Sequence, residues 1–133
     1  MQLKITGSDN VKPVMSCILK ASLTVFRNWV KNSSCLISVF LDTKATDSEI
    51  QNVYLKPVQS IEAAIQNMLL AAHELGLATC WIGEILKNED KVRNLLGVSN
   101  DLQLMAVIAV GYSDRKNFKS KRRDISENIV SWL

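Results

Sequence analysis

The apolar residues between Ser60 and Leu75 recur at three- and four-residue steps, the spacing of one face of an α-helix. Leu69 and Leu70 widen that face, which predicts a central helix that is apolar nearly all round. Ser60 is suited to cap the start of the helix, and Gly76 to close it in a left-handed conformation. The periodic positions are Ile61, Ala64, Ile65, Met68, Ala71, Ala72 and Leu75.

The remaining pattern alternates short apolar runs with helical ones, which favours an α/β fold in one domain covering residues 1–133. Polar, aperiodic stretches at 7–13 and 42–57 predict a turn and a loop. The predicted strands are Gln2 to Thr6, Cys35 to Leu41, Leu77 to Trp81 and Leu102 to Val110. The predicted further helices are Val14 to Val30, Asn88 to Leu96 before Gly97, and a last short one that Asp124 or Ser126 can cap.

The composition argues against a membrane-spanning, a secreted or a metal-binding protein. The chain has 133 residues, 47% of them hydrophobic and 22% charged, and no apolar run is long enough to span a bilayer. Lys4 and Asp9 stand where a signal peptide would be apolar, so we expect a cytoplasmic protein without membrane contact. The spacing of Cys17, Cys35 and Cys80 predicts buried, reduced thiols and no metal site.

Four segments in order carry a family resemblance. They are QNMLLAAHELGL running into TCWIG at 66–83, VRNLLG at 92–97, LQLMAVIAVG at 102–111 and KRRDISENIV at 121–130. This succession resembles the nitroreductase family of flavin mononucleotide (FMN) enzymes. The resemblance implies an α/β (α+β) fold with a mixed sheet flanked by helices.

The chain departs from that family at its beginning. Members of the family usually start with two helices, of which the first carries an R-R-S-x-R motif for the FMN phosphate, and no segment of this chain matches either helix. The opening MQLKITGSDNVKP corresponds instead to the first strand of the family fold and the turn after it. We therefore expect a nitroreductase-like domain truncated at its N-terminus.

The resemblance places Ile82, Gly83 and Glu84 beside the isoalloxazine ring of FMN, with a backbone N–H of this segment directed at flavin N5. Gly83 would let the ring approach closely because it has no side chain. The alternative for Gly83 is a tight turn that requires glycine.

The segment RKNFKSKRR at 115–123 concentrates basic residues just after the last predicted strand. It has three interpretations: a solvated loop, a nucleic-acid patch, and a clamp for the FMN phosphate. Phe118 is its only aromatic residue, which disfavours nucleic acid. The clamp follows from the resemblance, because Lys121 and Arg123 have the K-x-R spacing used near the family's C-terminus, with Arg122 pointing away.

The implied activity is that of an FMN-dependent oxidoreductase that passes a hydride from NAD(P)H through the flavin to a nitroaromatic or quinone-like acceptor. The flavin carries this chemistry, so no side chain is assigned as catalytic. The resemblance also implies a homodimer with FMN at the subunit interface. Two alternatives remain: a nitroreductase-like fold that has lost FMN and acts as a binding or structural protein, and a small nucleic-acid-binding domain.

Overall fold

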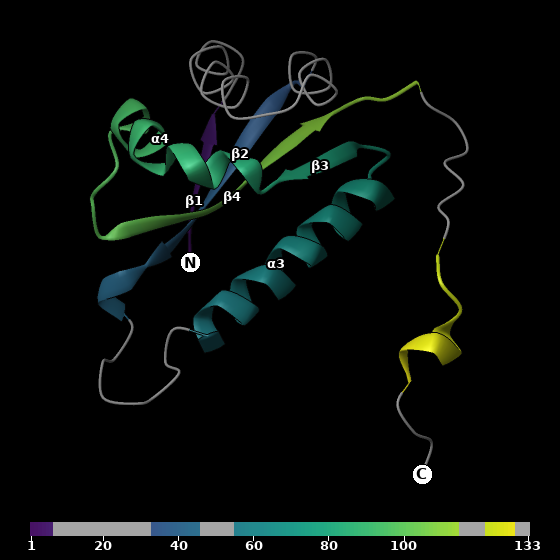
Figure 1. Cartoon of the computed structure of the whole chain (residues 1–133). Helices are drawn as coiled ribbons and strands as arrows, with labels where there is room; N and C mark the ends of the chain where they lie inside the picture. The colour runs from purple at the N-terminus through teal and green to yellow at the C-terminus, as the bar shows by residue number, and fades with distance from the viewer. Residues whose placement is uncertain (7–32, 46–54, 115–121, 130–133) are drawn as a thin grey trace.

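The computed structural model describes residues 1–6, 33–45, 55–114 and 122–129, which form a four-stranded sheet with helices on both faces (Figure 1). The predicted strands are confirmed to within one residue as β1 (Gln2–Thr6), β2 (Cys35–Asp42), β3 (Ala78–Ile82) and β4 (Leu102–Gly111). The predicted turn at 7–13, the helix at 14–30 and Cys17 lie outside the described residues.

The strands are ordered β1-β2-β4-β3, and all three pairings between them are antiparallel. The α/β arrangement is confirmed, but the described part of the sheet contains no directly paired parallel strands. Parallel pairing is absent there because β4 lies between β2 and β3 in the sheet. The chain crosses from β2 to β3 through helix α3 (Leu55–Glu74), so these two strands run in the same direction, but β4 lies between them and pairs with both.

A β-bulge in β4 sorts its apolar residues between the two faces of the sheet. The register moves from Val39 opposite Ala106 to Phe40 opposite Leu104, which leaves Met105 as the extra residue. Met105 and Ala106 consequently face the same side, and the alternation continues from there. Next to the bulge, the Leu104 N–H donates to Glu89 Oε1 at 3.0 Å. This hydrogen bond connects the first residue of helix α4 (Glu89–Leu96) to β4.

Two apolar cores lie on the two faces of the sheet. One packs β2 and β4 against the 3₁₀ turn η2 (Glu84–Asn88) and helix α4 (Glu89–Leu96), and the other packs them against α3. Because β2 and β4 contribute to both cores, most of their side chains are buried and none is exposed, as their largely apolar runs predicted. The first core includes Leu36, Phe40, Ile82, Ile85 and Val92, and the second includes Val39, Leu41, Ile61, Ile65 and Ile108.

The predicted start of the central helix is wrong by one and a half turns. Helix α3 begins at Leu55, and Ser60 lies inside it, where its Oγ donates to the Lys56 carbonyl at 3.0 Å instead of capping the N-terminus. Pro57 is the third residue of the helix. A proline is tolerated there because the N–H groups of the first turn have no acceptor within the helix.

Helix α3 is buried on one side only within this chain, so the expectation of burial nearly all round is not met by a single copy. Ile61 and Ile65 are its fully buried residues. Leu70 is 58% exposed, and Leu75, just after the last turn, is 75% exposed. A long helix that presents leucines to solvent has an apolar surface available for a partner.

Gly97 closes α4, as predicted, and it does so in the left-handed conformation, with φ +60° and ψ 37°. Gly97→Ala is expected to lower the free energy of unfolding by about 1–2 kcal/mol, the cost of this conformation for an L-residue. An added Cβ would meet no atom within 4 Å, so backbone strain is the whole effect. Urea unfolding measures the loss, with Gly83→Ala at φ −84° as the matched control, and equal stability of the two variants would contradict the prediction.

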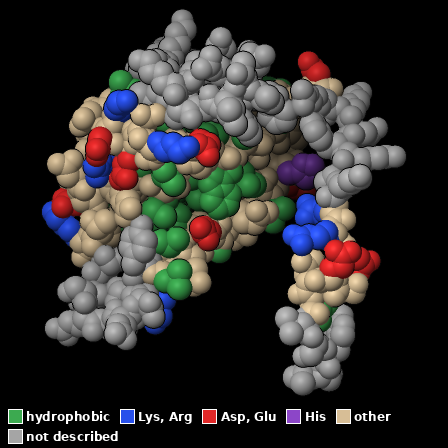
Figure 2. All heavy atoms as spheres, in the orientation of Figure 1, with side chains coloured by type: hydrophobic (Ala, Val, Ile, Leu, Met, Phe, Trp, Pro, Cys, Tyr) green, Lys and Arg blue, Asp and Glu red, His purple; other side chains and the backbone are tan. Residues whose placement is uncertain are grey.

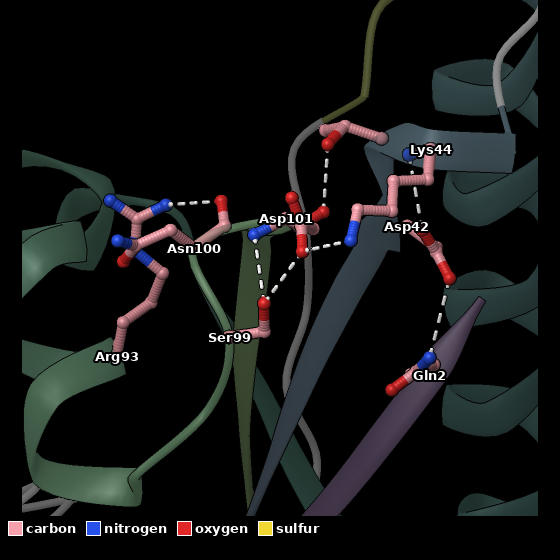
Figure 3. Close-up of polar contacts among 8 residues, drawn as sticks. Gln2, Asp42, Lys44, Arg93, Ser99, Asn100 and Asp101 are labelled. Atoms are coloured by element: carbon pink, nitrogen blue, oxygen red, sulfur yellow. Dashed lines mark hydrogen bonds and ion pairs between the residues drawn. The ribbon is translucent and has the colours of Figure 1, made fainter.

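Polar contacts join the end of β2 to the start of β4 (Figure 3). Lys44 Nζ lies 2.7 Å from Asp101 Oδ2, and Ser99 Oγ donates to the same oxygen at 2.8 Å. These two hydrogen bonds hold the pKa of Asp101 below its ordinary value. Thr43 Oγ1 and N both donate to the Asp101 carbonyl, at 2.8 and 2.9 Å. The predicted loop at 42–57 therefore begins as a fixed 3₁₀ turn, η1 (Thr43–Ala45), and its last residues belong to α3.

The C-terminal segment 122–129 stands apart from the sheet (Figure 1). Asp124 caps the 3₁₀ turn η3 (Ile125–Asn128) by accepting the Ser126 N–H at 2.9 Å, as predicted, although the turn is 3₁₀ and not α. Residues 122–128 are all exposed, including Ile125 at 73%. Among the described residues, no helix is long and apolar enough to cross a membrane.

Candidate functional site

The junction of β3 with η2 brings three of the predicted site residues together. Ile82 ends the strand and Glu84 begins the 3₁₀ turn, with Gly83 between them. The side chain of Ile82 is 5% exposed and lies in the same apolar core as the fully buried Ile85. Ile82 can therefore meet a bound group only through its backbone, while its side chain and that of Ile85 fix the position of the junction.

Gly83 is exposed and free of the constraints that usually require glycine. Its φ of −84° and ψ of −28° are open to any L-residue, which argues against the alternative of a turn that demands glycine. A Cβ built on Gly83 would meet no atom of the described residues within 4 Å. The space above the backbone is open to a molecule from outside, and a flat ring lying there would be displaced by a side chain. This geometry fits FMN.

Backbone donors are present at the same place. The first hydrogen bond of η2 runs from Leu86 N to the Gly83 carbonyl at 3.1 Å. The N–H groups of Glu84 and Ile85 precede that bond, so they have no acceptor inside the turn. A backbone N–H beside an open glycine matches the donor expected for flavin N5.

Glu84 is paired within the turn. Its Oε2 lies 2.6 Å from Lys87 Nζ, and both side chains are largely exposed. Sequence reasoning did not single out Lys87. The signal that would have found it is the three-residue spacing of a carboxylate and an ammonium group in a turn directly after the glycine.

Exposed apolar side chains gather in the middle of the face between α3 and α4 (Figure 2). The large exposed hydrophobic residues near the junction in sequence are Trp81, at 39%, and Leu86, at 43%. Successive strand residues point to opposite faces, so Trp81 lies on the face opposite Ile82, which is the α3 side. At this exposure Trp81 is not a buried core residue of the single chain.

The structure does not bring the proposed phosphate clamp together with the junction. Arg123 belongs to the exposed segment 122–129, which stands apart from the sheet, and Lys121 lies outside the described residues. Arg122 is exposed as well. The two halves of the predicted site are thus separate surfaces of one chain.

Cys80, the cysteine near the junction, is a poor nucleophile at neutral pH. Cys80 is a free thiol beside the first core, and burial raises its pKa, so little thiolate is present at neutral pH. Cys35 is also free and half-buried. Among the described residues, no three histidine, cysteine, aspartate or glutamate side chains gather as metal ligands.

Comparison with known proteins finds relatives of one kind. A protein of Archaeoglobus fulgidus, provisionally named an NADH dehydrogenase/NAD(P)H nitroreductase, is 33% identical over 96 residues, which cover 70% of this chain and 53% of that protein. A Methanothermobacter thermautotrophicus protein of the same provisional name is 38% identical over 69 residues, covering 50% of this chain and 36% of its own length. The chain thus spans about half or less of these relatives.

Solved structures share the fold. A nitroreductase from Desulfovibrio desulfuricans, solved in complex with FMN, is 28% identical, with a TM-score of 0.79 over 99% of this chain and 72% of that one. An FMN-dependent nitroreductase from Clostridium difficile is 20% identical with a TM-score of 0.73, over 98% of this chain and 73% of that one, and supports the fold alone. The profile of the nitroreductase family matches residues 19–112. The chain therefore belongs to the nitroreductase family.

Proposed function

We propose that this chain acts as an FMN-dependent oxidoreductase that passes a hydride from NAD(P)H to a nitroaromatic or quinone-like acceptor. The observation that carries the proposal is Gly83, which is exposed, has unstrained dihedral angles and has no neighbour within 4 Å of a Cβ. Within the described residues, neither the dihedral angles nor the neighbours of position 83 require a glycine. A flavin ring lying on the backbone at position 83 would leave no room for a side chain, and this would explain the glycine.

Ile82, Gly83 and Glu84 would hold the isoalloxazine ring through their backbone, and Lys121 and Arg123 would hold the phosphate. The guanidinium of Arg123 suits a phosphate because its fork of N–H donors can bond two oxygens at once. When bound, FMN supplies the hydride acceptor and donor atom, and the protein supplies position and charge.

The proposed active form is a homodimer. The exposed leucines of α3 and the exposed segment 122–128 are the observations that support it, because a second chain could cover both. FMN would lie where the two chains meet.

Leu70→Ala is expected to raise the dissociation constant of the dimer roughly 150-fold, because a leucine buried at an interface contributes roughly 1.5 kcal/mol and each of the two chains loses one. Sedimentation equilibrium measures this constant. The matched control is Leu95→Ala on α4, a leucine with 45% exposure on a different helix, which should leave association unchanged. Equal effects of the two substitutions would place the interface elsewhere.

The activity itself is tested by oxidation of NADH and of NADPH with a quinone or a nitroaromatic compound, on protein loaded with FMN. We expect turnover that requires both the flavin and the acceptor. A loaded protein that oxidises neither nucleotide would contradict the proposed reaction. We place the enzyme in the cytoplasm, because its nucleotide donors are found there and Cys35 and Cys80 are free thiols.

A further inference from the structure

We propose that Lys87 is a positioning residue of the flavin site, which holds the Glu84 carboxylate along the η2 turn and neutralises its charge beside Gly83. This inference rests on the proposed function, since it concerns the charge that a bound flavin would meet. The juxtaposition that supports it is the 2.6 Å contact between Lys87 Nζ and Glu84 Oε2.

The 3₁₀ geometry of η2 brings the two side chains together. With three residues per turn, residues i and i+3 lie directly above one another, so Glu84 and Lys87 project from the same line of the turn. Ile85, between them in sequence, is fully buried and packs in the first core. The turn is therefore anchored from below, and its charged pair is held on the outer side.

The pair changes the charge beside the open glycine. Glu84 follows Gly83 directly, so an unpaired carboxylate would stand next to the ring, and it would oppose the negative charge that a flavin gains on reduction. Lys87 offsets this repulsion by keeping an ammonium group on the carboxylate. Charge near the ring nitrogens is one of the means by which a protein sets a flavin's reduction potential.

The proposed role and a purely structural role of the ion pair differ in what they predict for stability. The side chains of Lys87 and Glu84 are 71% and 56% exposed in this chain, and exposed ion pairs of this kind contribute little to folding. Removing Lys87 should therefore leave the unfolding midpoint almost unchanged. The effect should appear in the reduction potential of the bound flavin.

The test is a spectrophotometric redox titration of the FMN-loaded protein, with FMN affinity and thermal unfolding measured on the same samples. Lys87→Gln is expected to shift the midpoint potential to a more negative value, and Lys87→Arg to keep it. Adding Glu84→Gln to Lys87→Gln should move the potential back toward that of the unchanged protein. The control is Lys91→Gln, which removes a nearby ammonium group that bonds Asn88 Oδ1 at 3.0 Å and no carboxylate.

The outcomes separate this inference from the function on which it rests. If Lys87→Gln holds FMN at an unchanged potential, or if Lys91→Gln shifts it equally, the role of Lys87 is overturned and the flavin site stands. If Lys87→Gln loses thermal stability, Lys87→Arg keeps it and neither shifts the potential, the pair is structural and the inference is also overturned. If the unchanged protein takes up no FMN, both proposals fall together.

Discussion

Gly83→Val is expected to weaken FMN binding by about 1–3 kcal/mol, the cost of forcing extra methyl groups into a filled space. This is roughly a 5- to 150-fold rise in the dissociation constant. The valine would stand in the open space above the backbone, where a flavin ring would otherwise lie. Fluorescence titration with FMN measures the change, and Gly83→Ala should give a smaller loss in the same direction.

The same substitutions have the opposite effect on folding, which makes the prediction specific. At φ −84° with no atom within 4 Å of a Cβ, a side chain at position 83 strains nothing. Replacing glycine by alanine at such a position stabilises a protein by about 0.4–1 kcal/mol, because the unfolded chain loses freedom. Variants that bind FMN normally would show that position 83 is only a connection between β3 and η2.

Arg123→Ala is expected to weaken FMN binding by about 1.5–3 kcal/mol, the contribution of a hydrogen bond to a charged group. In binding terms this is roughly a 10- to 150-fold rise in the dissociation constant. The side chain is exposed in the single chain, so its loss should not disturb the fold. Isothermal titration with FMN measures the effect.

Two comparisons isolate the contribution of the phosphate contact to FMN affinity. Arg122→Ala removes the same charge from the neighbouring residue, and it should leave FMN affinity unchanged. Riboflavin lacks the phosphate, so its affinity should be the same for Arg123→Ala and the unchanged protein. Equal losses for FMN and riboflavin would mean that Arg123 does not bind the phosphate, and equal losses for both arginine variants would indicate a diffuse charge effect.

Much of the sheet was predictable because strands buried on both faces leave a continuous apolar run, as in 35–41 and 102–110. The glycine stops were predictable for a similar reason, since Gly76 and Gly97 have φ of 73° and 60°, where other residues are strained. The bulge at Met105 was not. Because every residue from Leu104 to Val110 is apolar, no alternation is left there to show where one residue is extra.

The start of α3 was missed because two signals pointed to the wrong residue. Ser60 is a good capping residue and Pro57 is a poor helix former, yet the serine bonds back to Lys56 and the proline occupies the first turn, where its missing N–H costs nothing.

The site was predictable in part. The segment Ile82 to Glu84 lies at one exposed junction, but sequence alone gave no measure of the space above Gly83 and no sign of the Glu84–Lys87 pair. Both features depend on the position of η2, which is set by the packing of Ile85 in the first core. Such packing between distant residues cannot be read from the sequence. Arg123 is exposed and apart from that junction in the single chain, so its place at the flavin remains part of the proposed function.

The most direct test of the central claim is gel filtration of the protein after incubation with FMN, with an absorbance spectrum recorded across the eluted peak. We expect flavin bands that elute with the protein at about twice the 14.9 kDa mass of one chain. A colourless protein peak, with all flavin in the small-molecule fractions, would contradict the account. The chain would then be a nitroreductase-like fold that serves as a binding or structural protein.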